Sequence, residues 1–172
     1  MITKTILQGV PDNDRSPNET IRTRRRAAGF AEHPVSRDIL ETLVKCGIYA
    51  PSGHNMQTWR FTVLEGAASI QTLETLVRRN NAQFPGFRRP AALILLSNDR
   101  RNPYGVQDCS CAAQNILLAA RSLGLDAELL NPLTAICDEP EIRAMLRSYD
   151  MPDEHIVQVC VALGYSAQRR NA

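Results

Sequence analysis

Two groups of polar residues in this 172-residue sequence have the types and spacing needed to hold a phosphorylated ring compound. The first consists of short arginine runs at 22–26, 88–89, 100–101 and 169–170, because guanidinium groups recognise phosphate by paired hydrogen bonds. The second is the segment 51–57, in which Asn55 and Gln57 each carry a hydrogen-bond donor and an acceptor. From residue types alone, an alternative stays open: the arginines form solvated faces, and the segment only reverses the chain.

Other kinds of reactive site find no support in the sequence. The chain has neither a GxGxxG or GxxxxGK[ST] phosphate loop nor a GxSxG nucleophile elbow. Its three histidines are far apart and have no cysteine or carboxylate at ligand spacing, so we predict no metal site. The five cysteines lack such a spacing as well, and we interpret them as buried, reduced thiols rather than as disulfides.

Charge and hydropathy narrow the class of protein. The 20 Lys and Arg against 18 Asp and Glu give a net charge of +2, which by itself does not indicate a nucleic-acid partner. Trp59 and Phe61 fall in an expected buried strand and do not alternate with the arginines, which also argues against nucleic acid. No apolar run is long enough to span a membrane, and residues 1–9 do not read as a secretory signal. We therefore expect a cytoplasmic protein without a membrane partner.

The polar groups must be positioned by a mixture of helices and strands. Helical spacing and end signals predict helices at about 16–28, 36–50, 67–79, 108–123 and 138–147. Apolar runs predict strands at about 59–64, 91–96, 127–130 and 156–163. We expect residues 1–15 to form an extended arm and residues 16–172 to form one domain, with an α+β or three-layer arrangement.

Residues 50–61, APSGHNMQTWRF, strongly resemble the APSxxNxQPWxF signature of the flavin-dependent nitroreductase family. Other segments follow in the order of that family. They are the arginines 24–26 before Phe30, the apolar strand 91–96, the helix 108–123 with its QNILLAA sequence, and VALGY at 161–165. The resemblance covers nearly the whole chain from about residue 20.

The resemblance implies an α+β, nitroreductase-like three-layer fold with a central mixed, mainly antiparallel sheet flanked by helices. It also implies a homodimer that binds FMN in two sites at the subunit interface. Members of the family take a hydride from NADH or NADPH and pass it to nitroaromatics, quinones or similar small-molecule acceptors by a ping-pong mechanism. Because the cofactor performs this chemistry, we name no catalytic side chain.

Cofactor-binding positions follow from the same resemblance, residue by residue. The phosphate of FMN is expected at Arg25, with Arg24 and Arg26 beside it, and at the basic pair Arg169 and Arg170 after the last strand. The loop that borders the flavin from the partner subunit corresponds to Pro51, Ser52, Gly53 and Asn55, with Gln57 at a buried polar position beside it. The turn at Leu130 and Asn131 corresponds to the backbone whose N–H meets flavin N5, where a donor stabilises the reduced flavin.

Several positions depart from the family pattern. Arg26 and Ala28 replace a phosphate-binding serine and a basic residue, and Thr58 replaces the proline of the signature. Pro132 stands where many members have glycine, which removes one N–H donor. The short stretch 100–108 predicts a more open or smaller acceptor pocket. Two alternatives therefore remain: a degenerate relative that holds flavin without efficient turnover, and a flavoenzyme of the same fold with a different substrate.

Overall fold

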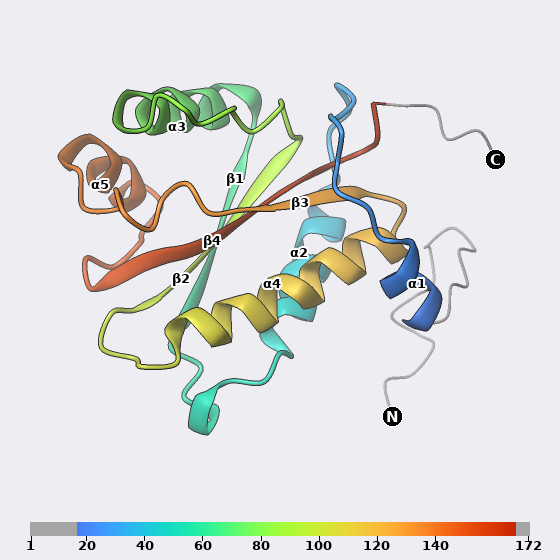
Figure 1. Ribbon diagram of the computed structural model, residues 1–172, viewed down its shortest axis with the longest axis horizontal. Helices are drawn as coiled ribbons and strands as arrows, with labels where there is room; N and C mark the ends of the chain where they lie inside the picture. The colour runs from blue at the N-terminus through green and yellow to red at the C-terminus, as the bar shows by residue number, and fades with distance from the viewer. Residues whose placement is uncertain (1–16, 168–172) are drawn as a thin grey trace.

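The structure, a computed structural model, describes residues 17–167 and places a four-stranded sheet between two layers of helices (Figure 1). Along the chain the elements are α1 (Pro17–Thr23), α2 (Arg37–Ile48), the short 3-10 helix η2 (Gly53–Asn55), β1 (Trp59–Glu65), α3 (Ala67–Asn80), β2 (Ala92–Asp99), α4 (Gly105–Ser122), β3 (Asp126–Leu130), α5 (Pro140–Arg147) and β4 (His155–Gly164). The predicted arm at 1–15 and the pair Arg169 and Arg170 lie outside the described residues.

The strands lie in the order β1-β2-β4-β3, and each neighbouring pair is antiparallel. Ile94 of β2 is at the centre, paired with Val63 on one side and Val161 on the other. An isolated parallel bridge joins Arg26 to Ala127 of β3. The pairing is therefore mixed but mainly antiparallel, and the predicted fold class is confirmed.

Helices cover both faces of the sheet, which is why β2 and β4 read as almost continuous apolar runs. On one face, Ile94 and Leu96 belong to a buried cluster with residues of α2 and α4. On the other face, Leu93 and Leu95 belong to a buried cluster with residues of α3 and α5. Alternate side chains of one strand thus supply two cores, and the molecule has three layers (Figure 1).

Small residues allow α4 to lie close to its neighbours. Ala112, Ala113 and Ala120 are buried on this helix, as its sequence predicts. Gly47 of α2 faces it so closely that a Cβ atom there would lie 2.8 Å from the ring of Phe61 and 3.1 Å from the side chain of Ile116. The close contact between α2 and α4 therefore holds the end of α2, from which the following loop begins.

Two predicted helix ends are wrong for reasons that concern the candidate site. The first helix ends at Thr23 rather than near residue 28, because the chain then pairs with β3 through Arg26. Helix α4 begins at Gly105, three residues before the predicted start. Asp108 is therefore not the residue that caps this helix but a buried residue of its first turn.

His155, the first residue of β4, is half-buried, and its Nδ1 lies 3.1 Å from the hydroxyl of Ser97 in a hydrogen bond. Burial lowers the pKa of His155 from its ordinary value of 6.5 and outweighs the carboxylates of Glu154 and Asp99, which act in the opposite direction. The unfolded chain then binds a proton more readily than the folded chain. Stability contributed at this position is present above pH 6.5 and is lost as the pH falls below that value.

We expect the free energy of unfolding to fall when the pH is lowered from about 7.5 to about 5.5, and to fall less in His155→Asn. The asparagine oxygen can still accept a hydrogen bond from Ser97, but the side chain does not titrate. Urea denaturation of both proteins at the two pH values measures the difference. The same pH dependence in both proteins would contradict this origin of the acid sensitivity.

Candidate functional site

The loop between α2 and β1, residues 51–57, adopts a strained backbone at the amino-terminal end of α4. His54, Asn55 and Gln57 have φ angles of 50, 55 and 49°, in the left-handed region that residues other than glycine seldom adopt. Such conformations persist where surrounding contacts enforce them, and they are common at functional sites. The loop is therefore a shaped segment rather than a simple chain reversal.

Two amide side chains of this 51–57 loop interact with each other. Gln57 Nε2 donates to Asn55 Oδ1 at 2.7 Å, and the Gln57 N–H donates to the Ser52 hydroxyl oxygen at 3.3 Å. This arrangement uses one polar atom of each amide and leaves the second available to a ligand. Gln57 is exposed in the single chain, whereas the family pattern predicts a buried position for it.

Beneath the loop, a buried carboxylate connects it to α4. Asp108 accepts the Gly53 N–H at Oδ1 and the Asn102 side-chain amide at Oδ2, at 2.8 and 3.1 Å. Asn102 Nδ2 also donates to the hydroxyl oxygen of Thr58, at 2.8 Å. Sequence analysis identified neither Asp108 nor Asn102 as a residue of the site, because their partners are distant in the chain.

The predicted phosphate-binding arginines follow α1. Arg25 is exposed and donates to the carbonyls of Arg22 and Arg24, at 2.9 and 3.1 Å, at the carboxyl end of that helix. Among residues 17–167, neither Arg24 nor Arg25 forms an ion pair, whereas Arg26 pairs with Glu128 of β3. Arg24 and Arg25 therefore keep positive charge available for an anionic ligand.

Glu128 is another buried polar residue that sequence analysis did not single out. Its side chain is 3% exposed, pairs with Arg26, and lies 3.9 Å from Arg88 between Oε2 and Nε. Arg88 also donates to the Ala27 carbonyl at 3.0 Å, so these groups hold the segment after α1 against β3. An acidic residue inside the apolar strand DAELL, together with the arginine run at 88–89, is the signal from which this cluster could have been suspected.

Leu130 lies farther along the same strand as Glu128, and Asn131 follows directly after it. Leu130 ends β3 and is half-buried, and Asn131 is exposed in the turn that follows. The side-chain oxygen of Asn131 accepts a hydrogen bond from the Thr134 hydroxyl. Leu130 and Asn131 thus border the same strand as the arginines 24–26. We call these five residues together the β3 group.

The 51–57 loop and helix α1, which precedes the arginines 24–26, lie at opposite ends of α4 (Figure 1). The loop is bonded to the first turn of this helix, whereas α1 lies beside its carboxyl end. A helix of 18 residues is about 27 Å long. One chain therefore does not bring the loop of the predicted cofactor site together with the arginines 24–26.

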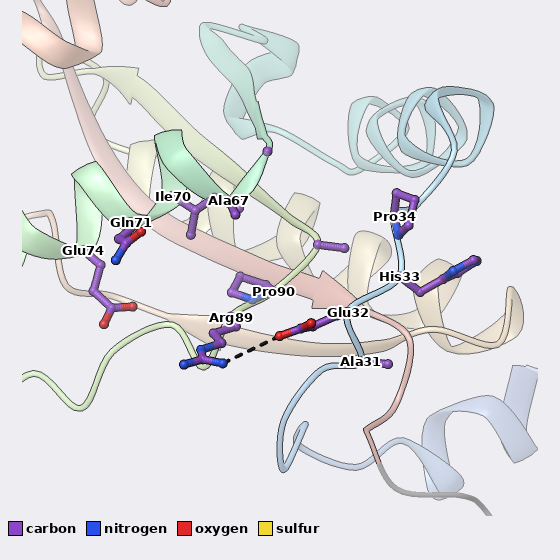
Figure 2. Close-up of a pocket in the computed structure, with 12 residues that line it drawn as sticks. Ala31, Glu32, His33, Pro34, Ala67, Ile70, Gln71, Glu74, Arg89 and Pro90 are labelled. Atoms are coloured by element: carbon purple, nitrogen blue, oxygen red, sulfur yellow. Dashed lines mark ion pairs between the residues drawn. The ribbon is translucent and has the colours of Figure 1, made fainter.

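A pocket of about 760 Å³ opens elsewhere, between the segment 31–34, the start of α3 and residues 89–91 (Figure 2). At its rim, Arg89 and Glu32 form an ion pair at 3.7 Å. None of the predicted cofactor-binding residues lines this pocket. This pocket and the predicted cofactor site are therefore different places.

Three other features bear on function: possible metal ligands, possible membrane-spanning helices and the cysteines. Within residues 17–167 there is no group of three or more His, Cys, Asp or Glu side chains that could hold a metal ion. In the same range, no helix has the length and apolar character that crossing a membrane requires. Burial raises the pKa of Cys109 to about 12, so this thiol stays protonated at neutral pH. Cys137 and Cys160 are also buried, but Cys111 is exposed, contrary to our interpretation of it.

Comparison with known proteins defines the class. The model of the Nitroreductase family matches residues 21–165. The chain is 30% identical over 158 residues to a protein of Archaeoglobus fulgidus that is provisionally named an NADH dehydrogenase/NAD(P)H nitroreductase, with 88% of this chain and 86% of the relative covered. It is 25% identical over 201 residues to the nitrobenzene nitroreductase of Ectopseudomonas oleovorans, with 87% of this chain and 86% of that protein covered.

The solved structures agree with this class. A nitroreductase with bound FMN from Bacteroides fragilis superposes with a TM-score of 0.83 at 30% identity, covering 92% of this chain and 95% of that one. Fold and sequence together define an oxidoreductase of the α+β nitroreductase type. The chain belongs to the nitroreductase family, and the resemblance drawn from residues 50–61 is confirmed.

Removing the Glu128 carboxylate tests whether it holds the segment after α1 against β3. We expect Glu128→Ala to lower the free energy of unfolding by about 2 kcal/mol, because the hydrogen bond to Arg26 is lost and Arg88 loses its ion-pair partner. The control is Glu32→Ala, whose pair with Arg89 is exposed and should change stability by less than about 0.5 kcal/mol. Urea denaturation measures both values, and similar losses in the two variants would refute the assignment.

Proposed function

We propose that this protein is an FMN-dependent oxidoreductase that takes a hydride from NADH or NADPH and reduces a nitroaromatic, a quinone or a similar small molecule by a ping-pong mechanism. The observation that carries the proposal is a nitroreductase fold that bears both the 51–57 loop and the β3 group, which we assign to the cofactor site. The name of the A. fulgidus relative supports the nicotinamide donor, and the FMN in the B. fragilis structure supports the cofactor.

The residues of the β3 group suit the binding of FMN. Arg24 and Arg25 form no ion pair within residues 17–167 and are assigned to the phosphate, and the pair Arg169 and Arg170 belongs to the same proposal. Pro132 has no N–H, so the backbone donor for the flavin ring is assigned to the turn at 130–131. FMN, when bound, supplies the hydride-transfer chemistry, while the protein binds the cofactor and orients it.

A second copy of the chain completes the site in this proposal. The loop of one protomer borders the flavin that the β3 group of its partner holds, which accounts for the separation of the two along α4. Large apolar side chains beside the loop support such an interface. Tyr49 and Val106 are 81% and 58% exposed, and Ile48 and Met56 are exposed as well. Apolar surface of this kind marks a protein contact.

The proposed location is the cytoplasm. Cys46, Cys109, Cys111, Cys137 and Cys160 are all free thiols in the structure, and free thiols are typical of reducing compartments.

The first test is spectroscopic. We expect the purified protein to be yellow with a flavin spectrum, to bleach anaerobically with NADH or NADPH, and to regain its colour when a nitroaromatic or a quinone is added. Parallel lines in double-reciprocal plots would support the ping-pong mechanism. Colour that persists with both reduced nicotinamides would favour the flavin-binding relative without turnover. Protein that stays colourless after incubation with excess FMN would end the proposal.

The second test concerns the phosphate. We expect Arg25→Ala to weaken FMN binding about tenfold or more, because a hydrogen bond to a charged group contributes about 1.5–3 kcal/mol. Riboflavin, which lacks the phosphate, should lose almost no affinity. Arg101→Ala is the matched control, since Arg101 is paired with Asp99 at the end of β2. Quenching of flavin fluorescence gives the dissociation constants. Equal FMN affinity in the two variants would remove Arg25 from the site.

The third test concerns the oligomeric state. We expect analytical ultracentrifugation of the flavin-loaded protein to give the mass of two chains. A stable monomer with one FMN bound per chain would contradict the shared site.

A further inference from the structure

The carboxylate of Asp108 is fixed inside the protein directly behind the 51–57 loop. Its side chain is 2% exposed, and each of its oxygens accepts a hydrogen bond, from the Gly53 N–H and from Asn102 Nδ2. A buried charge is tolerated when its hydrogen-bonding capacity is used. Because Asp108 belongs to the first turn of α4, it ties the loop to the most enclosed helix of the fold.

The hydrogen bonds continue from Asp108 to the other end of the loop. Asn102 Nδ2 donates to the Thr58 hydroxyl oxygen at 2.8 Å, and the Thr58 hydroxyl donates to Asn98 Oδ1 at 2.7 Å. Thr58 stands where the family signature has proline. Proline would restrict the backbone by its ring, whereas Thr58 is held by side-chain hydrogen bonds. The loop is thus fastened at Gly53 and again at Thr58, and both attachments lead to Asp108.

The outer side of the loop is held by Tyr104. Its ring covers Gly53 so closely that a Cβ atom at this position would lie 2.3 Å from the ring, and its hydroxyl lies 3.3 Å from His54 Nε2. The three left-handed residues of the loop are energetically unfavourable relative to an ordinary backbone. Contacts with Asp108 and Tyr104 hold the loop in this strained conformation.

We propose that Asp108 is a positioning residue for the flavin ring: through Gly53 and Asn102, it holds the 51–57 loop in the backbone conformation that borders the isoalloxazine. This inference rests on the proposed function, since it assumes that the loop meets a flavin. Contacts within the chain hold this conformation, which lowers the ordering that flavin binding has to impose. Asn55 and Gln57 are therefore presented to the ring in a fixed arrangement.

The decisive variant is Asp108→Asn. Both carboxylate oxygens accept from N–H donors, so an amide in either orientation places its NH₂ group against one of them. We expect FMN and riboflavin to lose affinity by the same factor, about tenfold, because a buried hydrogen bond that holds the loop is lost. Equal losses distinguish a defect at the ring from one at the phosphate, which Arg25→Ala should confine to FMN.

Asp38→Asn provides the matched control, because Asp38 also lies in the first turn of a helix but is exposed. Thr58→Val removes the hydroxyl at the other attachment and should weaken both flavins, and combining it with Asp108→Asn should cost less than the sum of the two. This second variant decides the matter if Asp108→Asn does not fold.

Flavin fluorescence titration gives every dissociation constant, and thermal unfolding of each flavin-free variant shows whether the fold is intact. An Asp108→Asn protein that is folded and binds both flavins within twofold of the Asp38→Asn control would overturn the inference. So would a loss restricted to FMN. If the unmodified protein binds no flavin at all, the proposed function itself has failed, and that result is distinct from either of these.

Discussion

Close packing of α4 against the sheet and against α2 is the constraint on which the arrangement of the candidate site depends. Small side chains such as Ala112 and Ala113 let this helix approach its neighbours closely, so its position in the core is fixed by packing. The 51–57 loop is bonded to its first turn, and the segment after α1 lies beside its last. A packed helix does not bend to close this separation. A single chain therefore does not bring the 51–57 loop to its own arginines 24–26.

Two buried carboxylates fix the two parts of the site in different ways. Asp108 is surrounded by neutral N–H donors, which hold the loop through hydrogen bonds of defined direction. Glu128 is paired with Arg26 and lies near Arg88, and it neutralises positive charge while fastening the chain to β3. Arg24 and Arg25, which have no such counter-charge among the described residues, retain the charge that an anionic ligand needs.

The sequence predicts most of the fold but less of the site. Apolar periodicity predicts the five α-helices and four strands of the described residues, because apolar residues recur at the positions that face a core. It misplaces the end of α1 and the start of α4, since both depend on contacts with distant segments. The signature at 50–61 predicts the family. Asp108 and Glu128 could not be found in this way, because their partners Gly53 and Arg26 are 55 and 102 positions away.

The glycine of α2 that touches the Phe61 ring also bears on how such an enzyme could be redesigned. Gly47 has no room for a side chain, and Gly53 is covered by an aromatic ring, so the framework of the loop tolerates no enlargement at either position. Met56, in contrast, is exposed and has an ordinary helical backbone. A library that diversifies Met56 alone would vary the exposed side of the loop and leave intact the contacts that hold it.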